Sequence, residues 1–230
     1  MGLKQTLNST LGGKYVMAVT GLLLFLFTIG HMAGNLQVFL GPDAINTYAQ
    51  MLKGMPLVLW VVRGGLLTVL LLHVALGILL QSRSSRARPV GYVYNKSRRA
   101  TWASRSMLPT GLIILAFIIY HLLHFTVGMT HPDHFEKVEM HEGVARHDVH
   151  QMVVLGFRKG FVTLTYVIAN LLLGLHLSHG ATSWFQSLGL NDKRWTPTFR
   201  LLAQGLVAAV VLGNVAIPLA IYTRLYSPSL

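Results

Sequence analysis

The 230-residue sequence contains no cysteine, so the chain can form no disulfide bond and offers no thiolate for a zinc site or an iron–sulfur cluster. Charged residues are also scarce, at 11% of the chain, whereas hydrophobic residues make up 53%. Only seven residues are acidic, and all of them lie between the long apolar runs. This composition excludes an ordinary water-soluble domain and indicates a membrane protein.

Five apolar stretches are long enough to cross a bilayer, which takes roughly 20 mostly apolar residues in a helix. They cover residues 15–38, 57–82, 103–130, 157–184 and 200–224. The first stretch is too long for the apolar part of a signal peptide, and no cleavage site follows it. We therefore expect one transmembrane domain, residues 1–230, built as an all-α bundle of five helices.

The basic residues are distributed unevenly between the two sides of the membrane that this topology defines. The side of the N-terminus has Asp192 as its one acidic residue and carries these cations: Lys4, Lys14, Arg83, Arg86, Arg88, Lys96, Arg98, Arg99, Arg105, Lys193, Arg194 and Arg200. On the other side the charges balance. The positive-inside rule therefore predicts a cytoplasmic N-terminus and an external C-terminus. Topology accounts for the net charge of +12, so a nucleic-acid partner is not expected.

Histidines occur inside four of the five predicted spans, where an ionisable side chain is costly and usually functional. These residues are His31, His73, His121, His124, His176 and His179. From the helical rise, His31 and His121 lie at one depth, about 26 Å from the cytoplasmic face. His73 and His176 share a second depth, about 13 Å from that face.

Two histidines that face each other at one depth can bind the iron of a haem from both sides. The two levels therefore predict two b-type haems, an outer one between His31 and His121 and an inner one between His73 and His176. A zinc or copper site would need ligands that converge on one point, which two separate levels do not provide.

Several segments resemble the di-haem cytochrome b subunit of succinate:quinone oxidoreductases, the single-chain, five-helix membrane anchor of succinate dehydrogenases and fumarate reductases. The resemblance covers nearly the whole chain and is carried by the following segments: Ile29-Gly30-His31-Met32-Ala33-Gly34-Asn35, Leu72-His73-Val74-Ala75-Leu76-Gly77, Thr110-Gly111-Leu112 with Tyr120-His121, and His176-Leu177-Ser178-His179-Gly180. It implies the same four ligands in the same pairs.

The resemblance also implies partners and a location. The chain would anchor a flavoprotein and an iron–sulfur subunit on the cytoplasmic side of the cytoplasmic (inner) membrane and exchange electrons with quinone, which in this branch of the family is generally menaquinone. The basic loop from Arg83 to Arg105 would either form part of the docking surface or contact lipid headgroups.

Further residues are candidates for supporting roles. Arg63 lies near the predicted outer haem and would either pair with a propionate or extend to the membrane surface. His124 and His179 would either bond a propionate or quinone or only line the bundle. Quinone contacts are expected from residues at the membrane borders, such as Asn35, Gln37, Trp60 and Arg63. His131, His134, His141, His147 and His150 lie in a charged outer segment, where we expect exposed side chains rather than a metal site.

Two other classes of protein fit the same pattern of histidines. A cytochrome b of another respiratory dehydrogenase, such as a hydrogenase or formate dehydrogenase, also pairs histidines across helices. A haem-free transporter could use them to bind protons or substrate. The presence of haem and the identity of any attached dehydrogenase distinguish these possibilities.

Overall fold

The computed structural model describes residues 9–87, 105–189 and 192–228. It contains five helices that are long and apolar enough to cross a membrane, as predicted. They are α2 (Thr10–Asn35), α4 (Pro56–Arg86), α6 (Met107–His121), α9 (Gly160–Ser187) and α10 (Thr196–Tyr222). A 3₁₀ turn, η1 (Leu36–Leu40), follows α2, and a π-helical turn, η2 (Leu122–Thr126), follows α6. The chain is thus an all-α membrane bundle.

Local sequence signals explain where these helices begin. Ser9 caps α2, because its hydroxyl accepts a hydrogen bond from the backbone N–H of Gly12. Pro56 and Pro197 lie in the first turns of α4 and α10, where a helix does not need the N–H group that proline lacks. Residues 103 and 104, at the predicted start of the third span, and most of the basic loop fall outside the described ranges.

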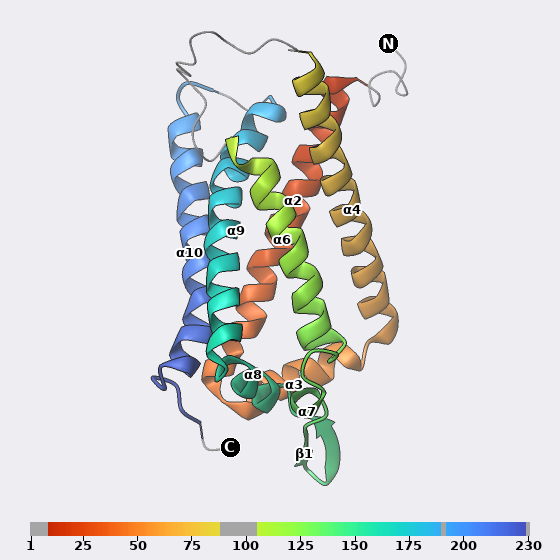
Figure 1. Cartoon of the computed structure of the whole chain (residues 1–230), viewed down its shortest axis with the longest axis vertical. Coiled ribbons are helices and arrows are strands. Elements are labelled where there is room, and N and C mark those ends of the chain that lie inside the picture. Colours follow the sequence, from red (N-terminus) through yellow and green to blue (C-terminus); the bar gives the residue numbers. More distant parts are fainter. Residues whose placement is uncertain (1–8, 88–104, 190–191, 229–230) are drawn as a thin grey trace.

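The long helices run alternately up and down, so α2, α6 and α10 descend in Figure 1 and α4 and α9 ascend. Helix α9 packs against α10, α6 and α2, while α4 packs mainly against α2 at the edge of the bundle. No residue of α4 is buried, and apolar side chains such as Leu57 and Leu71 are exposed along it. Such exposed apolar faces are what a lipid environment requires.

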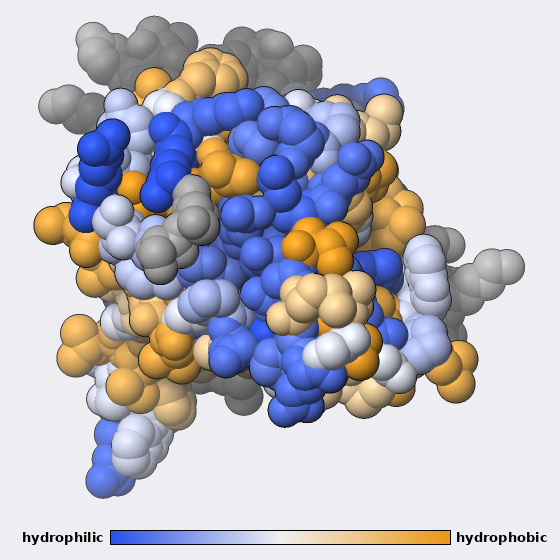
Figure 2. All heavy atoms as spheres, turned by 90° about the horizontal axis from the view of Figure 1, so that it is seen from below, coloured by the Kyte–Doolittle hydropathy of each residue, from blue (hydrophilic) through white to orange (hydrophobic). Residues whose placement is uncertain are grey.

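Short elements gather where α2 and α10 end, at the lower end of Figure 1. They are α3 (Pro42–Lys53), α7 (Pro132–Phe135), the antiparallel hairpin of β1 (Val138–His141) and β2 (Val144–His147), and α8 (Val149–Phe157). We call them the end cap. In Figure 2, which views this end, hydrophilic residues extend across the centre and hydrophobic residues lie around much of the rim.

The expectation that the histidines of the 131–150 segment are exposed is wrong. His134 and His150 are only 6% and 3% exposed, and His131, His141 and His147 are half-buried. The burial of His150 follows from long-range contacts: the side chain of Asn46 in α3 accepts a hydrogen bond from the His150 N–H and donates to Glu139 and Asp148. No group of three or more potential metal ligands is found among the residues that the structure describes.

Candidate functional site

The structure brings the four predicted ligand histidines together in two pairs. The ring centroids of His31 in α2 and His121 in α6 are 5.7 Å apart, with an angle of 89° between the ring planes. Those of His73 in α4 and His176 in α9 are 6.4 Å apart, with an angle of 68°. The first pair thus joins the two descending helices α2 and α6, and the second joins the two ascending helices α4 and α9. The members of each pair are the ones that share a predicted depth.

A threonine on a neighbouring helix holds each ring of the second pair. The Thr20 Oγ1 in α2 lies 3.1 Å from the Nδ1 of His73. The hydroxyl of Thr20 itself donates to the backbone carbonyl of Val16, four residues earlier. Because its one proton is used there, the Thr20 oxygen accepts a hydrogen bond from the Nδ1–H of His73. This leaves the Nε2 of His73 as the ring nitrogen with a free lone pair.

The same arrangement recurs at the other ring of this pair. The Thr110 Oγ1 in α6 lies 3.3 Å from the Nδ1 of His176 and donates to the carbonyl of Ser106, 2.7 Å away. His176 is thus fixed in the same tautomer as His73. Two rings whose Nε2 atoms both carry a lone pair have the protonation state that binding to a metal requires.

Glycines next to these threonines allow the rings to approach their neighbouring helices. A Cβ atom on Gly21 would lie 3.1 Å from the Cε1 of His73, and one on Gly111 would lie 3.3 Å from the Cε1 of His176. Both distances are shorter than ordinary van der Waals contact, so a larger residue would push on the imidazole. In each Thr-Gly pair, the threonine thus bonds the imidazole and the glycine leaves room for it.

Tyr166 of α9 connects the first pair to His124. Its hydroxyl lies 3.2 Å from the Nδ1 of His121 and 3.1 Å from the Nδ1 of His124. Tyr166 is 5% exposed and His124 is 1% exposed, and the Nε2 of His124 has no hydrogen-bond partner among the described residues. Gly156 allows α8 to cover this ring, because a Cβ there would be 3.2 Å from it.

His131 and His134 extend this group of rings into the end cap. The centroids of His124 and His131 are 5.3 Å apart, and those of His131 and His134 are 5.0 Å apart. The Nζ of Lys159 lies 3.2 Å from the Nδ1 of His131. Burial, the largest cause, and the cation of Lys159 lower the pKa of His131 below 6.5.

The other predicted site residues lie apart from these contacts. The guanidinium of Arg63 is exposed and lies 5.3 Å from the centre of the Trp60 ring, an arrangement that favours a cation–π interaction. The side chain of Asn35 donates to the backbone carbonyl of His31. His179 is half-buried one turn after His176.

The sequence analysis gave no site role to the threonines, the glycines or Tyr166, although a signal for four of them exists. Thr20-Gly21 precedes His31 by eleven residues, and Thr110-Gly111 precedes His121 by the same interval. An eleven-residue separation corresponds to about 16 Å along a helix. In both α2 and α6, the same distance therefore separates a histidine of the first pair from the threonine that bonds a histidine of the second pair.

No family model, curated protein or solved structure matches this chain. The chemistry of the site therefore has to follow from its own residues.

Proposed function

We propose that this chain is the cytochrome b subunit that anchors a succinate:quinone oxidoreductase, either a succinate dehydrogenase or a fumarate reductase, in the cytoplasmic membrane. It would hold two b-type haems, the outer one between His31 and His121 and the inner one between His73 and His176. The observation that carries this proposal is the pairing of four intramembrane histidines at two levels, with both inner rings bonded by threonines through Nδ1.

The distances within the pairs fit haem iron. A metal–nitrogen bond is about 2 Å long and the nitrogen lies about 1 Å from the centre of its ring, so two axial imidazoles have centroids about 6 Å apart. The observed separations of 5.7 and 6.4 Å agree with this value. The angle between the two ring planes is not restricted by axial binding, since each ring only has to direct one nitrogen at the iron.

The chain's own residues orient these ligands. Thr20 and Thr110 hold the inner rings at Nδ1, which directs Nε2 away from the supporting helix. At the outer level, the Nδ1 atoms of His121 and His124 lie 3.2 and 3.1 Å from the hydroxyl of Tyr166. If His121 held the haem through Nε2, its proton would lie on Nδ1 and would be donated to Tyr166, whose hydroxyl would then donate to the Nδ1 of His124. Bound haem supplies one-electron redox chemistry that amino-acid side chains lack.

The charge at one end of the bundle supports the proposed orientation. Cations among the described residues gather at the end where α2 begins and α4 ends, and they include Lys14, Arg83, Arg86, Arg105, Lys193, Arg194 and Arg200. By the positive-inside rule this end faces the cytoplasm and the end cap faces outward. The flavoprotein and iron–sulfur subunits would dock at the basic end, and quinone, by the family resemblance menaquinone, would exchange electrons within the membrane.

The experiment is an optical spectrum of the full chain, purified in mild detergent with the subunits that accompany it. The dithionite-reduced sample should show a b-type absorption band and two haems per chain. His73→Ala and His176→Ala should each remove the inner haem, whereas His31→Ala and His121→Ala should each remove the outer one. His141→Ala, a change in the hairpin of the end cap, is the matched control and should keep both haems.

Other outcomes would overturn the proposal in different ways. A sample without the b-type band would exclude both haem classes and leave the transporter. Haem together with a hydrogenase or formate dehydrogenase would retain the cofactor but change the enzyme. An enzymatic reporter fused to the C-terminus should be active outside the cell, and cytoplasmic activity would contradict the orientation.

A further inference from the structure

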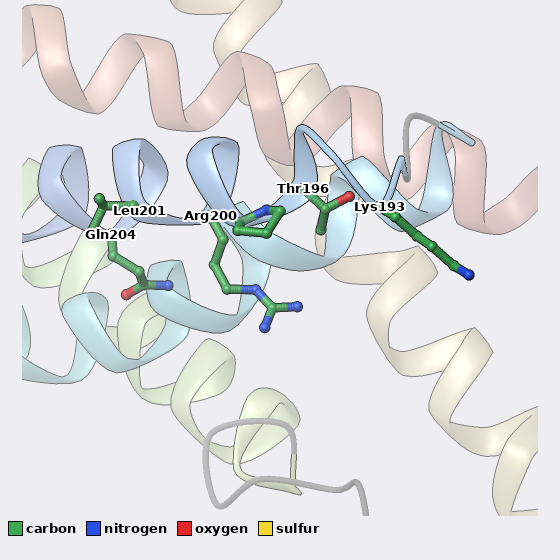
Figure 3. A pocket seen from close by; sticks show the side chains of 6 residues that line it. Lys193, Thr196, Arg200, Leu201 and Gln204 are labelled. Carbon is green, nitrogen blue, oxygen red and sulfur yellow. The ribbon is translucent and has the colours of Figure 1, made fainter.

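A surface groove along α10 has polar and apolar parts that the proposed haem sites do not use. Its wide end is an open hollow of about 600 Å³ where α10 begins, lined by residues of α10 and the turn before it: Lys193, Thr196, Pro197, Arg200, Leu201 and Gln204. In Figure 3 the side chains of Arg200 and Gln204 extend from the same side of α10, and Lys193 extends from the turn before the helix. Two cations thus lie at one mouth.

These two cations have no carboxylate partner in the part of the chain that the structure describes. The nearest acid in the sequence is Asp192, and its carboxylate accepts hydrogen bonds from the backbone N–H groups of Arg194 and Trp195. It therefore stabilises the turn that precedes α10. An anion from outside the chain would complement Lys193 and Arg200 at this mouth.

The other part of the groove is an open apolar hollow of about 390 Å³ between α9 and α10, which shares Gln204 with the first. Its other lining residues are Leu171, Gly174, Leu175, Val207, Ala208, Val211 and Leu212. Gln204 is held at the junction because its side-chain amide donates to the backbone carbonyl of Ser178 in α9, 2.7 Å away. Along α10, the lining of the groove therefore changes from charged residues at its beginning to residues that are apolar apart from Gln204.

The depth of each part matches one leaflet of a bilayer. Trp195 precedes α10 and stacks with Arg194 and Phe199, an aromatic cluster typical of the membrane–water boundary. From Arg200 to Leu212 the helix rises about 18 Å, compared with about 15 Å for half of the hydrocarbon core. A charged group at Arg200 would thus lie at headgroup level, with the apolar hollow at the level of acyl chains.

We infer that this groove binds one anionic glycerophospholipid. Its phosphate would lie between Lys193 and Arg200, and an acyl chain would pass Gln204 and occupy the hollow lined by Ala208 and Val211. The occupant has to be a lipid with an anionic headgroup, because the mouth carries two positive charges and the deeper part no polar group apart from Gln204. The inference is independent of the proposed haems.

The test measures lipid binding by native mass spectrometry. The full chain is delipidated in detergent and titrated with dioleoyl phosphatidylglycerol, or with dioleoyl phosphatidylcholine, which has the same chains but no net charge. We expect tighter binding of phosphatidylglycerol. The double substitution Lys193→Gln and Arg200→Gln should weaken it about ten- to thirtyfold, as the loss of two cations near a headgroup implies, and leave phosphatidylcholine unaffected.

Two matched controls separate the groove from general effects of charge and size. Lys14→Gln with Arg86→Gln removes two exposed cations from the same end of the bundle and should change the affinity less than twofold. Ala208→Trp fills the apolar hollow and should weaken both lipids, whereas Ala209→Trp, at an exposed neighbour that does not line the groove, should weaken neither.

Three results would overturn the inference. Equal affinity for the two lipids in the unaltered chain would exclude recognition of the anionic headgroup. Equal losses in the two charge variants would show a diffuse effect of the basic end, and displacement of the lipid by millimolar inorganic phosphate would show a free-phosphate site. Because lipid is counted by mass, each result is independent of whether haem is present.

Discussion

The Nδ1 of His73 donates a hydrogen bond to Thr20 on the neighbouring helix, across 3.1 Å, and His176 makes the equivalent bond to Thr110. In each case the threonine hydroxyl donates to a backbone carbonyl of its own helix. The pairs lie on four different helices, so the two bonds connect α2 to α4 and α6 to α9 at one level. They determine which nitrogen of each ring is available to a metal.

We predict that Thr20→Val weakens the hold of the inner site on haem. Valine keeps the shape of threonine but removes the acceptor, so the His73 ring loses the bond that fixes its tautomer. Loss of such a supporting bond typically lowers metal affinity about 10- to 100-fold. The measurement is inner-haem content per chain together with its midpoint potential. Thr20→Ser retains the hydroxyl and should restore both, and a valine variant with unchanged content and potential would contradict this role.

Gly21 provides a separate test of the space around His73. In Gly21→Ala the new methyl group lies 3.1 Å from the Cε1 of His73, so the ring has to shift by a few tenths of an ångström. We expect an altered electron paramagnetic resonance signal from the inner haem and an unchanged outer signal. Gly205→Ala, where no atom lies within 4 Å of the added carbon, is the control. Identical spectra from both variants would show that Gly21 does not control the position of the ring.

The five spans could be predicted from the sequence because the length of an apolar run is a local property. The depth of each histidine followed from the helical rise, and the structure places together the rings that share a depth. Whether these rings bind haem stays a prediction. The partners of His73 and His176 were missed because a threonine in an apolar helix gives no sign of which helix it faces.

The end cap shows why other parts could not be predicted. Residues 131–150 are charged and rich in histidine, which is typical of an exposed loop. Two hydrogen bonds nevertheless join this segment to α3, about one hundred positions earlier: Asn46 bonds Asp148, and Arg146 bonds Asp43. Bonds of this length depend on the tertiary fold and leave no periodic pattern. The burial of His150 follows from these contacts rather than from its neighbours in sequence.

Tyr166→Phe should affect the outer site alone. The substitution removes the hydroxyl that lies within 3.2 Å of both His121 and His124, and it leaves the aromatic packing with Phe117 and Phe157 in place. We expect a shifted midpoint potential for the outer haem and an unchanged inner one, measured by redox titration of the optical spectrum. Tyr120→Phe is the matched control, because its ring contacts Tyr166 and His124 while no described residue bonds its hydroxyl. Equal shifts in both variants would contradict a specific role of the Tyr166 hydroxyl.

Arg146 is expected to be the main ionic contact of the end cap. Its buried guanidinium bonds Glu139 at 2.6 Å, Asp43 at 2.7 Å and Thr47 at 2.9 Å. Arg146→Gln should lower the free energy of unfolding by about 2–4 kcal/mol, because the partly buried carboxylate of Glu139 then keeps its bond from Asn46 but loses its cationic partner. Thermal unfolding in detergent measures this loss. Arg158→Gln removes an exposed arginine and should change stability by no more than about 0.5 kcal/mol; a similar loss in both would exclude a specific network.

His150 should make the stability of the end cap depend on pH. Its Nε2 lies 2.8 Å from the hydroxyl of Tyr226, which itself donates to the carbonyl of Val38, so the Nε2–H of His150 is the donor. Burial, the largest cause, lowers the pKa of His150 below 6.5, although Asp148 and Glu139 act in the opposite direction. Burial likewise lowers the pKa values of His134 and His147.

A histidine with a lowered pKa binds its proton more readily in the unfolded chain than in the folded one. Stability is therefore retained above pH 6.5 and decreases as the pH falls through that value, by at most about 1.4 kcal/mol per histidine for each pH unit. We expect a lower melting temperature at pH 5.5 than at pH 7.5. In His150→Gln, whose amide can still donate to Tyr226 but does not titrate, this difference should shrink by about 2–4 °C. If the variant loses as much stability on acidification as the unaltered chain, His150 is not among the groups that cause the loss.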